Sequence, residues 1–169
     1  MKWVGAALVL AAASLICLIL LDDQKQHLEV YHSLSETLKI LRGELLSRGA
    51  TISEGIEKAG SASRGVGKEL MLTVMDGLRE LGERSFSEIW RNALATCSQE
   101  EKPESLETLA GLGSVLGRFD LDEQLKALDT CIKDLDERWE AEKKDYPARR
   151  KLLISLSLAG GIFLVILLF

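Results

Sequence analysis

Apolar side chains follow two patterns along this chain: uninterrupted runs at both ends, and a helical period between them. Residues 3–21 and residues 152–169 contain no charged side chain, over 19 and 18 residues respectively. As helices with a rise of 1.5 Å per residue, they would cover roughly 27–29 Å, close to the hydrocarbon thickness of a bilayer. Backbone polar groups inside lipid must be hydrogen-bonded within their own segment. We therefore expect a membrane-spanning helix at each end.

The first apolar run has two alternative interpretations. Lys2 before the run is typical of a signal peptide, with Ala11-Ala12-Ala13 as a small-residue cleavage site. Cys17 could instead carry a lipid after cleavage of a lipoprotein signal. Cleavage at the alanines would leave a short apolar segment before the site, and bulky Ile16 is unfavourable beside a lipidated cysteine. An uncleaved anchor is favoured, and both alternatives remain open.

The region between the runs is expected to be helical throughout. Its first helix continues from the first span to about Arg48-Gly49. The apolar positions of this helix recur every three or four residues and form one stripe, as expected for a surface helix that packs on a core. The members of the stripe are Leu28, Tyr31, Leu34, Leu38, Leu41 and Leu45.

Capping signals divide the middle of the chain into shorter helices. Thr51 to Glu54 and Ser85 to Glu88 have the spacing of capping boxes. We expect helices over 52–59, 66–82 and 86–97, a loop over 60–65, and a helix from Pro103 that stops at Gly117. Their expected core positions are Val66, Leu70, Val74, Leu78, Leu81, Ile89, Trp90, Ala93, Leu94, Cys97, Leu106, Leu109, Leu112 and Leu116.

The last helix before the second apolar run is predicted to be the longest. Asp120 is its expected N-cap, and its apolar positions are spaced alternately four and three residues apart. They are Leu121, Leu125, Leu128, Ile132, Leu135 and Trp139. The first and last helices would meet the membrane on one side, so we expect them to be antiparallel. Pro147 predicts a kink before the second span.

These patterns predict an all-α protein, with a bundle of about six helices between two transmembrane helices. The predicted domains are an N-terminal transmembrane helix at 1–21, a soluble bundle at 22–151 and a C-terminal transmembrane helix at 152–169. The middle domain contains all 26 acidic residues and all but one of the 21 Lys and Arg, a net charge of −6. This acidity argues against binding of nucleic acid, whose phosphates attract clustered cations.

A cluster of basic residues precedes the second apolar run: Lys143, Lys144, Arg149, Arg150 and Lys151. The positive-inside rule then places the middle domain in the cytoplasm. The favoured role of the cluster is to fix topology and meet anionic lipid headgroups. Docking of an acidic partner surface near the membrane is the second possibility.

Residues with catalytic or ligand-binding potential are sparse. Gly65-Val66-Gly67-Lys68 superficially suggests a P-loop, but Ala62 and Glu69 occupy positions where the motif needs Gly and Ser or Thr. His27 and His32 are five residues apart, so they do not share a helix face as metal ligands would. The three cysteines form no zinc pattern, and Trp90 and Trp139 lie on apolar stripes. We expect no enzymatic activity, cofactor, metal or small-molecule substrate.

Several segments together resemble the stage III sporulation protein AB family of endospore-forming bacteria. The resemblance is densest at Leu112-Gly113-Ser-Val-Leu116-Gly117-Arg-Phe-Asp120-Leu-Asp-Glu-Gln124. It extends to Leu38-Lys-Ile-Leu41-Arg-Gly-Glu44-Leu-Leu46, to Trp90, and to the ending from Ser157. Each segment alone is weakly specific, because Leu and Gly recur in any helical bundle. Their combination over the whole chain is more specific.

The resemblance implies a function. The soluble domain of that family is similar to the cytoplasmic domain of the inner-membrane platform protein in type II secretion and type IV pilus machines. The chain would be a platform in the mother-cell membrane around the forespore. It would bind a secretion-type ATPase and other membrane proteins of a channel complex. Because platform proteins carry two such domains and this chain one, self-association is also expected.

The resemblance also names candidate partner contacts: Leu116, Gly117, Asp120 and Gln124. A helix stop at Gly117 followed by an N-cap at Asp120 would explain the same residues without a partner. Two other functions stay open. One is a signalling receptor with its helical domain outside the cytoplasm, and the other is a general membrane scaffold.

Overall fold

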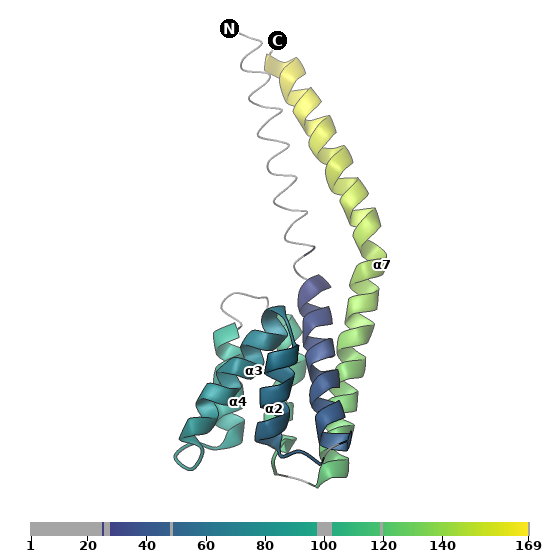
Figure 1. Ribbon diagram of the computed structural model, residues 1–169. Helices are drawn as coiled ribbons and strands as arrows, with labels where there is room; N and C mark the ends of the chain where they lie inside the picture. Colours follow the sequence, from purple (N-terminus) through teal and green to yellow (C-terminus); the bar gives the residue numbers. More distant parts are fainter. Residues whose placement is uncertain (1–24, 26–27, 48, 98–102, 119, 169) are drawn as a thin grey trace. The chain divides into compact units, whose positions relative to one another are not determined.

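The computed structural model describes residues 25, 28–47, 49–97, 103–118 and 120–168, without the side chains of 103–105, 108, 158, 161–162 and 164–168. This part of the chain is all-helical, and its one β-type contact is an isolated bridge between Leu81 and Arg84. A first helix covers 28–47, and the elements that follow are shown in Figure 1. They are α2 (Ile52–Ala62), α3 (Gly65–Gly77), the 3₁₀ helix η1 (Leu78–Glu80), α4 (Phe86–Cys97), α5 (Pro103–Ala110), α6 (Leu112–Val115) and α7 (Leu121–Leu168).

Packing divides the chain into a bundle, Glu29–Trp139, and a second unit made of the segments that flank it. The described side chains of α7 from Glu140 on are exposed or half-buried. The first apolar run, 3–21, lies outside the described residues. Within the described part of the chain, no helix combines the length and the apolar character needed to cross a bilayer. α7 does not end at Pro147, which lies inside it.

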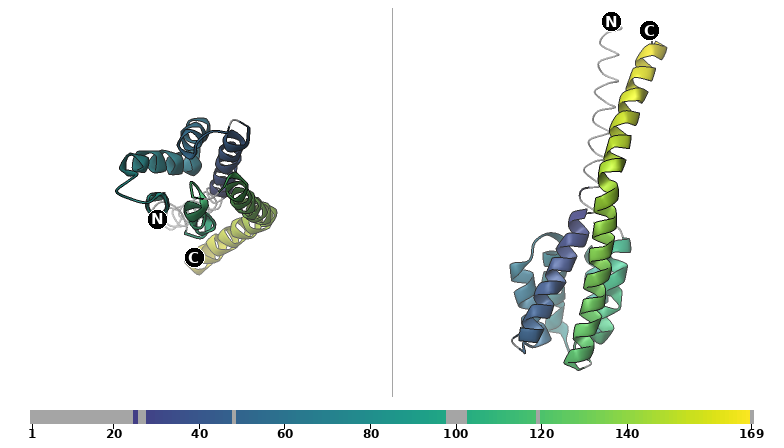
Figure 2. Two further views of the ribbon diagram at one scale, coloured as in Figure 1. Left: turned by 90° about the horizontal axis from the view of Figure 1, so that it is seen from below. Right: turned by 90° about the vertical axis from the view of Figure 1, so that its right-hand side faces the viewer.

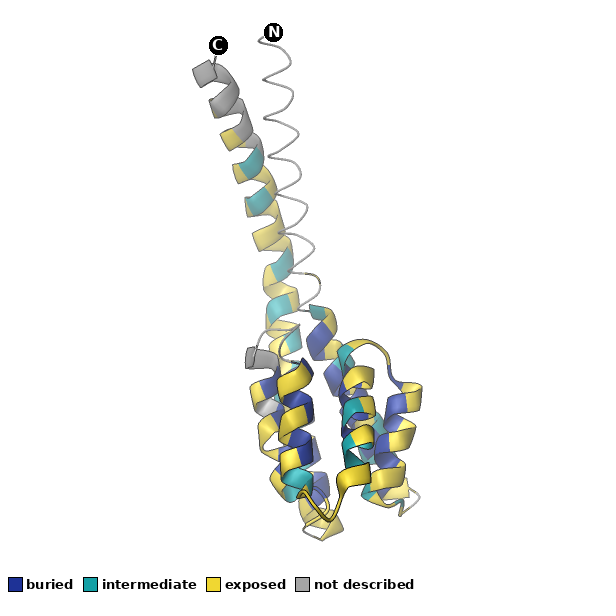
Figure 3. Ribbon diagram, turned by 90° about the vertical axis from the view of Figure 1, so that its left-hand side faces the viewer, coloured by how far each residue is buried: buried dark blue, intermediate teal, exposed yellow. Residues whose placement is uncertain are grey.

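The core of the bundle contains most of the predicted stripe positions. Figure 3 shows the buried residues on the faces that the helices turn toward one another. From the first helix, Tyr31, Leu34, Leu38, Leu41 and Leu45 are all buried, as predicted. Each of the helices α2 to α7 contributes buried residues to the same core: Ile56, Ala59, Leu70, Met71, Val74, Ile89, Trp90, Ala93, Leu94, Cys97, Leu106, Leu109, Leu112, Leu116, Leu125, Leu128, Ile132 and Leu135.

Two predicted core positions are wrong. Leu81 is 57% exposed and Leu121 is 43% exposed. Leu81 follows the 3₁₀ turn η1 and begins an exposed connection to α4, so it no longer lies on the face of α3. Leu121 is the first residue of α7, ahead of the stretch whose stripe packs on the bundle. The apolar period continues beyond the packed part of each helix.

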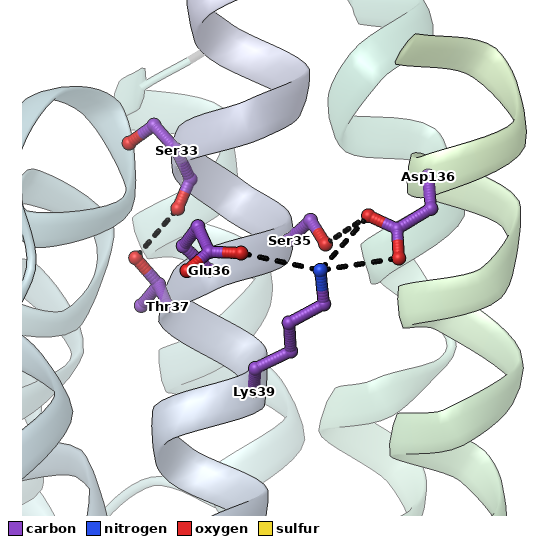
Figure 4. Close-up of polar contacts among 6 residues, drawn as sticks. All are labelled: Ser33, Ser35, Glu36, Thr37, Lys39 and Asp136. Atoms are coloured by element: carbon purple, nitrogen blue, oxygen red, sulfur yellow. Dashed lines mark hydrogen bonds and ion pairs between the residues drawn. The ribbon is translucent and has the colours of Figure 1, made fainter. Parts of the chain in front are cut away.

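The first helix and α7 lie antiparallel, as predicted, and polar side chains connect them. Figure 4 shows that the Asp136 carboxylate accepts hydrogen bonds from Ser35 Oγ at 2.5 Å and from Lys39 Nζ at 3.2 Å. Two turns of the first helix away from Ser35, Arg42 donates to both carboxylate oxygens of Asp129, at 2.5 and 3.1 Å. Residue numbers fall along α7 as they rise along the first helix, which fixes direction and register.

The pairing of the first helix with α7 continues toward the N-terminal end of the first helix. The rings of His32 and Trp139 stack with their centroids 5.1 Å apart. Figure 2 shows the first helix, in purple and blue, beside the green part of α7. The chain therefore enters the bundle and leaves it at neighbouring points, which is the arrangement that two spans in one membrane would require.

The junction between α2 and α3 differs from the prediction of a loop over 60–65. α2 extends to Ala62 and α3 begins at Gly65, so only Ser63 and Arg64 lie outside helices. Gly60 is buried in α2, and a Cβ there would lie 3.2 Å from the Cβ of Met71. The glycine therefore lets α2 approach α3 closely within a helix, instead of ending it.

The start of α3 explains the glycines that suggest a P-loop. Gly65 has a positive φ of 56°, which suits a glycine at this turn. Gly67 lies against the first helix, where its amide donates to Ser33 Oγ at 3.0 Å. Ser33 Oγ donates in turn to the Arg64 carbonyl at 2.6 Å. A Cβ on Gly67 would lie 2.0 Å from Thr37 Oγ1, so this position has no room for a side chain.

We predict that Gly67→Ala destabilises the protein by about 1–3 kcal/mol, since forcing a methyl group into a packed contact causes strain of that size. Gly43→Ala is the matched control, because the first helix has nothing within 4 Å of a Cβ there. Alanine should stabilise a helix at that position by roughly 0.5–1 kcal/mol. Thermal unfolding of the full chain, followed by circular dichroism, measures both. Equal melting temperatures for the two variants would contradict the contact.

Both predicted capping boxes are confirmed. The Glu54 carboxylate accepts from the Thr51 amide at 2.9 Å, and Glu88 accepts from the Ser85 amide at the same distance. These backbone hydrogen bonds, together with those from the two hydroxyls, lower the pKa of Glu54 and of Glu88. A carboxylate with a lowered pKa stabilises the fold above its unfolded pKa, and this contribution is lost as pH falls.

The variant E54Q/E88Q should therefore lose less stability than the wild type between pH 6 and pH 3. Thermal melts across that range measure the difference. The control E57Q/E83Q also removes two exposed carboxylates, and they lie outside the capping boxes. The stability of this control should depend on pH more nearly as that of the wild type does. Identical pH profiles for the two double variants would contradict the capping contribution.

Candidate functional site

The segment 112–124, where the family resemblance is densest, has a structural role at most of its positions. Leu116 is buried, at 1% exposure, and its amide donates to the Leu112 carbonyl at 2.9 Å. Gly117 is exposed and has φ +77°, the left-handed conformation that ends a helix. The predicted helix stop at Gly117 is thus confirmed.

The predicted helix from Pro103 to Gly117 is divided in two, as α5 and α6, near Gly111. At this break the buried indole Nε1 of Trp90 donates to the Leu109 carbonyl at 2.8 Å. In a continuous helix the amide of residue 113 would donate to that carbonyl. Gly113 faces the same tryptophan, and a Cβ there would lie 2.7 Å from Trp90 Cβ, Cγ and Cδ1. The tryptophan and the glycine therefore fit together as one contact between α4 and α6.

The N-cap predicted at Asp120 is confirmed. Its Oδ1 accepts from the Glu123 amide at 3.1 Å, and its carbonyl accepts from the Gln124 amide at 3.1 Å. Asp120 is exposed, whereas the Gln124 side chain is buried in the bundle, at 9% exposure. Of the four candidate contact residues, Gly117 and Asp120 are the two that a partner could reach without unpacking the bundle.

The basic cluster lies on the exposed part of α7. Lys143, Lys144, Arg149, Arg150 and Lys151 are all exposed. Arg149 is turned toward acidic neighbours, with ion pairs to Glu142 at 3.6 Å and to Asp145 at 3.7 Å. Arg150 and Lys151 line a different face of the helix, together with Tyr146, Pro147 and Ile154. That face has an open hollow of about 300 Å³.

The histidines and cysteines are the remaining residues considered for chemistry. No group of three or more His, Cys, Asp and Glu in the described part of the chain could hold a metal ion. His27 lies outside the described residues, and His32 stacks on Trp139. Burial, with a smaller effect of the Asp134 charge, raises the pKa of Cys131 to about 11, so its thiol is protonated at neutral pH. Cys97 is buried.

The polar contacts between the first helix and α7 are not predicted by the apolar pattern. Ser35 is fully buried beside the stripe, and a hydroxyl in that position needs a partner. Partial burial opposes the charge on Lys39, but hydrogen bonds and charges from Asp136 and Glu36 outweigh it and raise its pKa. The signal available in the sequence is a serine next to the stripe, but the sequence reveals neither its burial nor its partner.

Comparison with known proteins identifies the family of this chain. No curated protein and no solved structure matches it. The family model described as stage III sporulation protein AB (spore_III_AB) matches residues 2–169, nearly the entire sequence. This confirms the resemblance inferred from segments 38–46 and 112–124 and from the C-terminal run, and it supports a role in sporulation. The chain belongs to the stage III sporulation protein AB family.

Proposed function

We propose that this protein is a non-enzymatic platform in the mother-cell membrane around the forespore, with two membrane-spanning helices and the bundle facing the cytoplasm. It binds a secretion-type ATPase and membrane proteins of a channel complex that links mother cell and forespore. Self-association of the bundle domain is part of the same proposal. Membership of a sporulation family supports the setting of this proposal.

The single observation that carries the proposal is the pairing of the first helix with α7. His32 and Trp139 stack at one end of the bundle, where the chain enters and leaves it. The two uncharged runs of the sequence follow from that end in opposite directions along the chain. Two spans attached at one end of a helical bundle would hold it at a membrane and leave the rest of its surface to partners.

Charge supports the cytoplasmic orientation. The exposed basic residues of α7 come directly before the second uncharged run. Short basic segments beside a span are retained on the cytoplasmic side, so this flank favours a bundle that faces the cytoplasm. A secretion-type ATPase is a cytoplasmic protein, and the proposal requires this orientation.

The orientation is tested with a single cysteine at Glu83, in the full chain with its native cysteines replaced. Glu83 lies in the exposed connection between η1 and α4, whereas Ser63, in the loop expected from the sequence, is buried and would react poorly. A membrane-impermeant maleimide should label the residue only after sporulating cells are permeabilised. Labelling in intact cells would place the bundle outside the cytoplasm and favour the receptor function.

A second prediction concerns Asp120, which serves as an N-cap and is exposed. Asp120→Ala should destabilise the protein by about 1 kcal/mol through loss of the cap. Asp120→Asn keeps a side-chain oxygen that can cap the helix but removes the charge. If Asp120 is also a partner contact, both variants should co-purify with less ATPase, although only the alanine variant melts earlier. Full recovery of the ATPase with both variants would contradict the contact role of Asp120.

A further inference from the structure

Five residues of α7 form one face of the helix beside the second uncharged run. Tyr146, Pro147, Arg150, Lys151 and Ile154 follow one another at helical spacing and together line the open hollow of about 300 Å³. Two of these side chains are cationic, one carries a phenolic hydroxyl and two are apolar. The hollow therefore offers positive charge and apolar surface to the same ligand.

The two cations of the hollow are available to a ligand. In the part of the chain that the structure describes, neither Arg150 nor Lys151 has a carboxylate within ion-pair distance. Arg149, which does not line the hollow, instead forms ion pairs with Glu142 and Asp145. Of the three cations nearest the second uncharged run, Arg149 is therefore paired with carboxylates, whereas Arg150 and Lys151 keep their positive charge on the hollow. An anion is the ligand that this arrangement attracts.

The apolar members of the face distinguish the kind of anion. Ile154 is 44% exposed, and beyond Lys151 no charged residue follows in the chain. An inorganic phosphate ion would make no favourable contact with the exposed apolar surface of Pro147 and Ile154. A phospholipid places a phosphate at the level of the cations and its glycerol and acyl carbons beside the apolar residues that follow.

We propose that this hollow, which we name the α7 hollow, binds the phosphate of an anionic phospholipid. Arg150 and Lys151 hold the headgroup, while Pro147 and Ile154 contact its apolar part. This inference rests on the proposed function, because it requires the second uncharged run to lie in a bilayer. It goes beyond a general attraction to anionic membranes, since it assigns two of the five clustered cations to one lipid.

The test is native mass spectrometry of the detergent-solubilised full chain, titrated with phosphatidylglycerol or with phosphatidylcholine. The wild type should bind phosphatidylglycerol more tightly than phosphatidylcholine. In R150Q/K151Q the affinity for phosphatidylglycerol should fall by about tenfold or more, because each cation near an anionic lipid contributes on the order of fivefold. K144Q/R149Q is the matched control: it removes two positive charges of the cluster outside the hollow, and should lose far less.

Each other outcome overturns the proposal. Equal losses in the two double variants would mean diffuse attraction by net charge, and no loss in R150Q/K151Q would mean no site. Displacement of phosphatidylglycerol by millimolar inorganic phosphate would make the hollow a site for soluble anions. The proposed platform function is judged separately, by Glu83 labelling and ATPase co-purification. A correctly oriented platform without lipid selectivity would therefore refute this inference alone.

Discussion

The antiparallel pairing of the first helix with α7 is the contact on which the rest of the structure depends. The two helices are far apart in sequence, and the core contacts between them are supplemented by the Asp136 and Asp129 carboxylates. Exposed ion pairs add little stability, so their main effect is on direction and register, while Leu34, Leu38 and Leu128 supply buried apolar area. This pairing brings the two ends of the bundle segment together. That geometry supports the proposed attachment to one membrane.

Glycines at two helix contacts let the shorter helices close around this pair. Gly67 brings α3 against Ser33 and Thr37 of the first helix, and Gly113 brings α6 against Trp90. Both belong to motifs that invite a functional interpretation: a P-loop at 65–68, and the family segment at 112–124. In the structure both serve close packing, and the second also ends a helix and begins the next. Among the candidate contacts considered for partners or lipid, Gly117, Asp120, Arg150 and Lys151 are exposed.

The sequence predicts most of this fold because period and capping are local properties. The stripe of the first helix, both capping boxes, the stop at Gly117 and the cap at Asp120 all follow from neighbours within four residues. The break between α5 and α6 does not follow from local signals; at that point the Leu109 carbonyl accepts a hydrogen bond from Trp90, nineteen residues away. The loop predicted over 60–65 is longer than the observed one, because a glycine needed for close helix packing looks the same in the sequence as a glycine in a turn. Which cations of the basic cluster form ion pairs with carboxylates depends on the folded structure, and sequence spacing alone does not determine it.

The register between the first helix and α7 is the central claim, and a distance measurement tests it most directly. Spin labels would be placed at exposed Glu36 and Glu137 in one sample of the full chain, and at Glu36 and Asp122 in another. Position 122 is separated from position 137 by about 22 Å along the helix axis, at a rise of 1.5 Å per residue. Pulsed electron resonance should therefore give a short distance for the first pair and a clearly longer one for the second. Equal distances, or the reverse order, would contradict the antiparallel pairing and the membrane attachment built on it.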